Sequence, residues 1–121
     1  MYTKVLKAKV HLARVTGKNL LYEGSLSLDK DLMDLAGLKP FEAVWIYNLE
    51  NGERFETYLI PGKKGEVALN GAAARLGEVG DRIIIASYVW LSEEELKNFK
   101  VKLVFVDEKN NLKNLKEESI Y

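Results

Sequence analysis

The sequence contains no cysteine and a single histidine, His11. Without cysteine the chain can form neither a disulfide framework nor a thiolate metal site, and one histidine leaves the usual zinc-binding sets incomplete. We therefore expect no bound metal. The chain also lacks an excess of either charge, with 18 Lys and Arg against 18 Asp and Glu. A dedicated nucleic-acid-binding protein needs a basic excess to displace counterions from phosphate, so nucleic acid is not an expected partner.

Long hydrophobic runs are also missing. No stretch approaches the roughly 18 apolar residues that a membrane span requires, and residues 1–9 alternate charged with apolar side chains, which is not the pattern of a secretory signal. We therefore expect no membrane association and a cytoplasmic location. The 121 residues, 47% hydrophobic and 30% charged, are typical of one soluble globular domain. We expect that domain to span residues 1–121.

Alternation of apolar and polar residues predicts six or seven short strands, and Asn51-Gly52 is a strong hairpin signal between two of them. The predicted strands cover residues 2–16, 20–28, 42–49, 53–60, 66–69, 82–90 and 101–106. Short helices are expected at 30–36, 70–77 and 92–99, the first between an Asp29 N-cap and Gly37. The charged tail 107–121 offers only Leu112 and Leu115 as anchors. This pattern predicts a small, mainly β barrel.

Several catalytic motifs are absent. The chain has no Gly-x-Ser-x-Gly elbow and no phosphate-binding loop of the Gly-x-x-x-x-Gly-Lys type. The dipeptide Gly24-Ser25 has two interpretations. One is a strand bulge with a surface serine. In the other, glycine permits backbone strain, and the serine hydroxyl attacks the Gly24 carbonyl, which exchanges an amide for an ester.

Five short motifs occur in a specific order. They are Lys9-Val10-His11, Leu21-Tyr22-Glu23-Gly24-Ser25, Asn51 to Tyr58, Asn70-Gly71-Ala72-Ala73-Ala74, and Val79-Gly80-Asp81 before an apolar strand. In this order and spacing, over residues 1–107, the chain resembles the pyruvoyl-dependent aspartate 1-decarboxylases. The resemblance implies a six-stranded double-psi β-barrel with short helices, assembled as a homotetramer with active sites at subunit interfaces. A chain of 13.7 kDa has little room for an enclosed pocket of its own, which agrees with a shared site.

The resemblance also implies self-cleavage between Gly24 and Ser25. The products would be a β chain of residues 1–24 and an α chain of residues 25–121, whose former Ser25 becomes a covalent pyruvoyl cofactor. Thr57 would assist this maturation by hydrogen bonding the Gly24 carbonyl. The pyruvoyl ketone would form a Schiff base with L-aspartate, which loses CO2 to give β-alanine for pantothenate and coenzyme A synthesis.

The remaining matched residues receive roles by the same resemblance. Tyr58 matches the proton donor, a role that a hydrogen-bonded phenol can fill. Arg54 and Lys9 are the cations for the two substrate carboxylates. The other predicted substrate-binding residues are Thr57, Asn70, Gly71, Ala72 and Ala73, and His11 and Tyr22 are predicted to line the pocket.

Some alternatives stay open at the level of sequence. The sequence does not decide which cation binds which carboxylate, whether Trp45 or Tyr47 packs near the pocket, or whether maturation needs a helper protein. The role of the tail is also open. A rival hypothesis is a non-catalytic barrel that binds a partner and keeps Gly24-Ser25 intact. The joint presence of Lys9, Ser25, Arg54, Thr57 and Tyr58 favours the enzyme.

Overall fold

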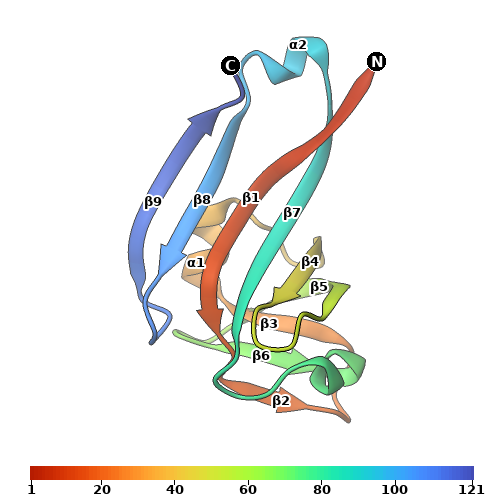
Figure 1. The fold of residues 1–121 in the computed structure, drawn as a ribbon, viewed down its shortest axis with the longest axis vertical. Helices are drawn as coiled ribbons and strands as arrows, with labels where there is room; N and C mark the ends of the chain where they lie inside the picture. The colour runs from red at the N-terminus through yellow and green to blue at the C-terminus, as the bar shows by residue number, and fades with distance from the viewer.

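The structure, a computed structural model, describes all residues from Met1 to Tyr121 and is mainly β (Figure 1). Strands and helices follow one another as β1 (Tyr2–Arg14), β2 (Gly17–Asn19), β3 (Ser25–Asp29), α1 (Lys30–Ala36), β4 (Ala43–Asn48), β5 (Arg54–Gly62), β6 (Val67–Asn70), the 3-10 helix η1 (Gly71–Leu76), β7 (Arg82–Ser92), α2 (Glu93–Leu96), β8 (Lys100–Val106) and β9 (Leu112–Ser119). None of the helices is long and apolar enough to cross a bilayer.

The strands form one nine-stranded sheet in the order β2-β6-β3-β5-β4-β7-β1-β8-β9, which is not closed by hydrogen bonds between its first and last strands. The predicted mainly β class is confirmed, with more strands than the six or seven expected. Figure 1 shows the long strands β1 and β7 running beside β8 and β9, while the short strands β2 to β6 gather at the other end of the molecule.

The pleat of each strand separates a core face from an outer face. In β1 the buried Ala8 and Val10 alternate with the half-buried Lys9 and His11, because successive side chains point to opposite faces. The same alternation buries residues of β3, β4, β5 and β7 in a single core of 20 side chains. Full burial of each large aliphatic side chain stabilises the fold by about 1.5–3 kcal/mol. The predicted functional residues of β1 therefore lie on the outer face.

Helix α1 has the ends that the sequence predicts. The Asp29 side chain accepts a hydrogen bond from the Asp31 N–H, and Gly37 ends the helix in the left-handed conformation at φ 69°. Leu32, Met33 and Ala36 form its buried stripe. Because Asp29 is also the last residue of β3, this cap fixes the end of the strand that begins at Ser25.

Three predictions differ from the structure. Residues 17–19, for which no strand was predicted, form the short strand β2, which pairs parallel with β6. The strand expected over residues 20–28 is wrong in its first half, since residues 20–24 form an exposed connection and β3 begins only at Ser25. Leu21 is apolar, as a buried strand residue would be, but it is 95% exposed. The tail, for which no element was predicted, forms β9, which pairs antiparallel with β8. All residues of β9 are exposed, so no apolar alternation marked this strand.

Candidate active site

The Gly24–Ser25 peptide joins an exposed loop to a buried strand. Gly24 is exposed, whereas Ser25, the first residue of β3, is only 1% exposed. Its Oγ accepts a hydrogen bond of 3.0 Å from Asn70 Nδ2 and lies 3.4 Å from the carbonyl oxygen of Glu23, to which it can donate. These contacts hold the Ser25 hydroxyl group beside the backbone of the same segment, whereas Gly24 belongs to the exposed loop.

Asn70 is the residue that fixes this hydroxyl group. It lies directly opposite Ser25 in the antiparallel pairing of β3 with β6, and it is buried. Its amide donates to Ser27 Oγ at 2.9 Å as well as to Ser25 Oγ. Asn70 also precedes helix η1, where an asparagine side chain often accepts a backbone hydrogen bond. It makes no such cap bond here, because the side chain turns toward the two serines.

Gly71 brings a second segment of backbone against the Gly24–Ser25 peptide. Its φ is +63°, and a Cβ atom built on it would lie 2.7 Å from Gly24 Cα, 2.9 Å from Gly24 N and 3.1 Å from the Tyr22 carbonyl oxygen. Only glycine fits this conformation and this approach together. Ala72 and Ala73 follow in η1, the first exposed and the second buried. We refer to Tyr22, Gly24, Ser25, Asn70 and Gly71 as the cleavage cluster.

Strand β5 runs parallel to β3 on the other side, with Leu26 opposite Leu59. Ser25 precedes Leu26 by one residue on β3, and Tyr58 precedes Leu59 by one residue on β5, so these two residues lie at the same level of the ladder. Thr57 lies one residue further back on β5. Tyr58 lies on the outer face with its ring 6.0 Å from that of Phe41. Thr57 is half-buried and pairs with the buried Val44, so it lies on the core face. Both predicted residues are thus near the Gly24–Ser25 peptide along the ladder, on opposite faces of β5.

Arg54 lies elsewhere on the outer face, in a cleft of about 390 Å³ whose lining residues we call the arginine cleft: Lys4, Trp45, Tyr47, Arg54 and Tyr88. The Arg54 guanidinium carbon stacks 4.3 Å from the centre of the Tyr47 ring. Trp45 and Tyr47 both line this cleft, so the structure places both candidate aromatics beside the arginine. None of the five ion pairs of the chain involves Arg54, which leaves its fork of N–H donors available to a carboxylate.

The two tyrosines of the arginine cleft are joined by a hydrogen bond of 2.6 Å between the hydroxyl groups of Tyr47 and Tyr88. Burial, this hydrogen bond and the neighbouring phenol together raise the pKa of Tyr88 to about 12. The Tyr88 hydroxyl group therefore stays neutral at physiological pH and places no phenolate charge beside Arg54.

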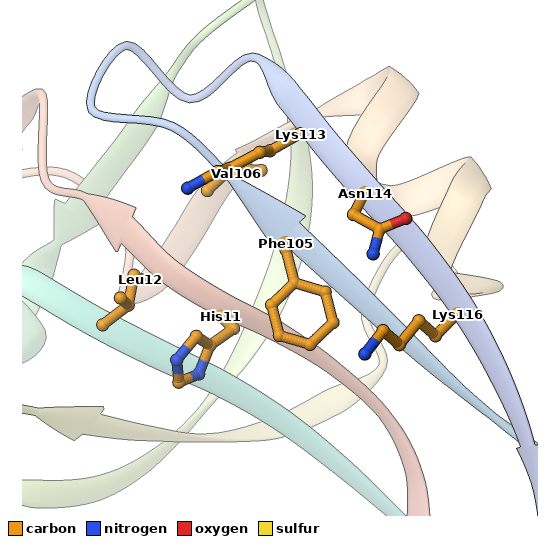
Figure 2. Close-up of a pocket in the computed structure, with 7 residues that line it drawn as sticks. All are labelled: His11, Leu12, Phe105, Val106, Lys113, Asn114 and Lys116. Atoms are coloured by element: carbon orange, nitrogen blue, oxygen red, sulfur yellow. The ribbon is translucent and has the colours of Figure 1, made fainter.

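Lys9 and His11 lie on the outer face of β1, apart from the cleavage cluster. Buried His11 Nδ1 has no hydrogen-bond partner, and burial, with the charge of Lys9, lowers the pKa of His11. Cross-strand pairing connects His11 through Ile84 and Tyr47 to Arg54 in one row. The row spans three strand spacings, about 14 Å. His11 and Arg54 therefore share one face of the sheet but not one pocket, since His11 lines a separate pocket between β1, β8 and β9 (Figure 2).

A second cleft, of about 350 Å³, adjoins the cleavage cluster. Tyr22 and Asn70 line it, as predicted for a site, together with Ser27 and Lys18, which sequence reasoning missed. Lys18 Nζ bonds to the Gly77 carbonyl oxygen and to Glu78. The signal for Ser27 was its spacing of two residues from Ser25, which places both on one face of a strand. Lys18 carried no such signal.

Comparison with known proteins agrees with this geometry. A sequence model of the family described as aspartate decarboxylase matches residues 1–113. The chain belongs to the aspartate decarboxylase family. It is 58% identical over 114 residues to the aspartate 1-decarboxylase of Persephonella marina, an alignment that covers 93% of this chain and 81% of the relative.

Two further aspartate decarboxylase relatives match almost the whole chain. The aspartate 1-decarboxylase of a Sulfurihydrogenibium species is 54% identical over 120 residues, covering 98% of this chain and 90% of the relative. That of a Hydrogenobaculum species is 55% identical over 118 residues, covering 98% and 94%. The resemblance that the sequence motifs indicated is therefore confirmed at the level of the aspartate decarboxylase family.

Proposed function

We propose that this protein is a cytoplasmic aspartate 1-decarboxylase, which converts L-aspartate to β-alanine and CO2 for pantothenate synthesis, and hence for coenzyme A. The observation that carries the proposal is the cleavage cluster, in which a buried serine hydroxyl, fixed by Asn70, follows a glycine that is packed against Gly71. A binding module has no need for this arrangement. Family membership agrees with it.

Maturation begins with the chain's own residues. Ser25 Oγ attacks the Gly24 carbonyl carbon, the Gly24–Ser25 amide bond breaks, and an ester forms with a free amino group on Ser25. Loss of the Ser25 Cα proton expels the Gly24 carboxylate and leaves a dehydroalanine residue. Water then replaces the nitrogen, which departs as ammonia, and the pyruvoyl group remains. Thr57, one residue before Tyr58 on β5, is our candidate for hydrogen bonding the Gly24 carbonyl as charge develops there.

The cluster fits the group that this reaction produces. The Asn70 amide that donates to Ser25 Oγ can equally donate to a carbonyl oxygen formed at the same residue, and the burial of residue 25 limits access of water. When present, the pyruvoyl group supplies the electron sink for decarboxylation. Residues 1–24 remain bound after cleavage, because β1 pairs with both β7 and β8.

Substrate recognition falls to the cations of the outer face. Arg54 offers a planar pair of donors to one aspartate carboxylate and Lys9 a point charge to the other. Around residue 25, Thr57, Asn70 and the backbone of Gly71, Ala72 and Ala73 complete the binding set, since the first N–H groups of a short helix have no intrahelical acceptor. His11 and Tyr22 line the pocket, and Tyr58 returns a proton to the α-carbon after CO2 leaves.

Assembly accounts for the spacing of these groups. Arg54 lies four residues before Tyr58 on β5, about 13 Å along the strand at roughly 3.3 Å per residue, and the cleft that Arg54 lines includes neither Tyr58 nor Ser25. We therefore propose a homotetramer in which the outer face of one subunit meets the cleavage cluster of its neighbour. The exposed apolar side chains of Leu20, Leu21 and Trp90 agree with such a contact.

For the barrel itself, we propose that the six consecutive strands β6-β3-β5-β4-β7-β1 form the double-psi core, with β2, β8 and β9 added outside it. The Thr16 N–H, just after β1, donates to the Val67 carbonyl oxygen of β6 at 2.8 Å, and the Thr16 hydroxyl also bonds to Val67. These bonds connect the two ends of the six-strand series and support closure.

The test is an intact mass spectrum of the purified, denatured protein, followed by an assay of β-alanine formation from L-aspartate. We expect two chains split after Gly24, the larger one lighter by one ammonia than a chain beginning with serine. Ser25→Ala should stay in one piece and be inactive, while Ser119→Ala, at the exposed end of β9, should match the unaltered protein. Normal decarboxylation by Ser25→Ala would refute the proposal.

A single intact chain in the unaltered protein would have two explanations. Prolonged warming, or addition of a cell extract that supplies a maturation factor, restores activity if cleavage is merely slow or assisted. A chain that stays intact and inactive after both treatments would instead support the rival hypothesis of a non-catalytic binding barrel.

A further inference from the structure

Ser27 is a buried residue beside the cleavage cluster, and the proposed mechanism assigns no role to it. It follows Ser25 by two residues on β3, so both hydroxyl groups lie on the same face of the strand, and it is only 8% exposed. Its Oγ accepts a hydrogen bond of 2.9 Å from Asn70 Nδ2, and Ser25 Oγ accepts one of 3.0 Å from the same nitrogen. An amide nitrogen has two N–H donors, so the two serines use both of them.

The Asn70 side chain has a competing position available to it. Asn70 is the N-cap residue of η1, with the extended backbone, φ −113° and ψ 148°, that an N-cap residue adopts. From this place an asparagine oxygen commonly accepts a hydrogen bond from a backbone N–H of the first turn, yet Asn70 makes no such bond. The terminal torsion of asparagine is soft, so a single bond to Ser25 would hold the amide less firmly than two bonds do. Ser27 therefore keeps the Asn70 amide directed at Ser25.

The donor at Ser25 Oγ matters most in the elimination step of maturation. In that step the Ser25 Cα proton passes to water, the electron pair of the C–H bond forms the Cα–Cβ double bond, and the Cβ–Oγ bond breaks. The electron pair of the broken bond stays on Oγ, which becomes a carboxylate oxygen of Gly24. Negative charge thus develops on the atom to which Asn70 donates, and hydrogen bonds to charged oxygens are the stronger ones. The initial attack gains no such help, because Oγ gives up electron density there.

We infer that Ser27 is a positioning residue for maturation, which acts through Asn70 to speed the elimination of the Gly24 carboxylate from the ester. The inference rests on the proposed self-cleavage and assigns Ser27 to its second stage. Ser25 stays opposite Asn70 in the pairing of β3 with β6, so the donor and Oγ keep their places once the ester has formed.

A competition between elimination and trapping of the ester tests this role. Full-length chain made by cell-free synthesis matures in a fixed concentration of hydroxylamine, which cleaves the ester and leaves an α chain that begins with serine. Elimination instead gives an α chain that begins with the pyruvoyl group, counted together with its oxime. Intact mass spectra give the ratio of the two α chains. The fragment masses also separate cleavage after Gly24 from attack of hydroxylamine on the Asn51–Gly52 and Asn70–Gly71 bonds.

The ratio of serine-started to pyruvoyl-started chains should rise by roughly tenfold or more in Ser27→Ala, as loss of a hydrogen bond to a charged oxygen predicts. Ser27→Thr keeps the hydroxyl oxygen and should have nearly the ratio of the unaltered protein. Adding Ser27→Ala to Asn70→Ala should change the ratio no further, because Ser27 acts through that side chain.

Ser87→Ala is the matched control. It also removes a buried serine hydroxyl group, but one that donates to Glu42 and does not touch Asn70. Destabilisation by this variant slows the formation of both α chains together, so the ratio should stay unchanged even if maturation is slower. The ratio therefore separates positioning in the elimination step from a general effect on folding.

Four results would overturn the inference. They are an unchanged ratio in Ser27→Ala, a ratio in Ser27→Thr as high as in Ser27→Ala, a further rise when Ser27→Ala is added to Asn70→Ala, and an equal rise in Ser87→Ala. If the unaltered chain forms neither product, the proposed function itself fails. Normal maturation of both the unaltered protein and Ser27→Ala would refute only the role of Ser27, so the two failures are distinguishable.

Discussion

The contact between Gly71 and Gly24 makes a quantitative prediction for the variant Gly71→Ala. The new Cβ would lie 2.7 Å from Gly24 Cα, whereas carbon atoms in contact prefer about 3.5 Å or more. The Gly24 backbone must therefore move by about 0.8 Å, or η1 must move away from it. Because a misplacement of about 1 Å in reacting groups can slow a reaction on the order of 100-fold, we expect self-cleavage of Gly71→Ala to be slower by about that factor.

The same substitution should also lower the free energy of unfolding. An L side chain in the left-handed conformation costs about 1–2 kcal/mol, and overpacking adds about 1–3 kcal/mol. We therefore expect a total loss of about 3 kcal/mol, measured by denaturant unfolding. Both Gly71→Ala and its reference should carry Ser25→Ala, so that cleavage does not confound the comparison.

Gly52→Ala is the matched control. Gly52 also has a positive φ, of +75°, but a Cβ there would meet nothing within 4 Å. This variant should lose only the conformational part, about 1–2 kcal/mol, and should cleave at the normal rate by a mass-spectrometric time course. If Gly71→Ala cleaved as fast as Gly52→Ala, the close approach of the two glycines would have no part in maturation.

Three further predictions concern other side chains of the site and its support. Asn70→Ala removes the donor to two buried serine hydroxyls, so cleavage should slow and unfolding free energy should fall by about 1–3 kcal/mol; normal cleavage kinetics would contradict the assigned role. Glu42→Gln weakens a half-buried pair with Lys7 at 2.9 Å and should destabilise the protein by about 1 kcal/mol near neutral pH, a value reduced by solvent screening. Burial would raise the pKa of Glu42, but hydrogen bonds from Ser87, Lys7 and Lys39 outweigh it and lower this pKa from 4.5. The stability difference between Glu42→Gln and the unaltered protein should therefore persist above pH 4.5 and vanish as the pH falls through the lower folded-state pKa. A stability difference that grows in acid, measured by denaturant unfolding, would refute the assignment. Arg54→Lys keeps the charge but loses the planar fork and the stacking on Tyr47, so KM for aspartate should rise about tenfold or more with cleavage unchanged, whereas Arg82→Lys, at an exposed ion pair, should leave KM unaltered.

The elements that the sequence predicted well are those whose signals are local. Alternation identified the strands that became β4, β5 and β7, and Asp29 and Gly37 marked both ends of α1. Local patterns failed where burial is decided by distant segments. Leu20 and Leu21 are apolar but exposed, and β9 has no buried face at all, although it pairs with β8 over most of its length.

The candidate site divides in the same way. The motifs supplied the identities of its residues, but not their arrangement, because the register between strands is a non-local property. That Asn70 stands opposite Ser25 follows from the pairing of β3 with β6, two segments more than forty residues apart in the chain. The separation of Arg54 from the cleavage cluster likewise depends on their positions along two parallel strands, which no spacing in the sequence reveals.

The pairing around Ser25 also has a consequence for the time at which the protein is made. Ser25 leaves the ribosome early, but Leu59 and Asn70, whose strands flank β3, are synthesised much later, and chains emerge at only about 5–20 residues per second. Pairings between such distant segments form slowly. A nascent chain therefore carries an inert Gly-Ser dipeptide, and the reactive arrangement arises only after residue 70 has joined the sheet. Self-cleavage would then occur only in chains that have finished folding, and the cleaved fraction would measure how much of the newly made protein has folded.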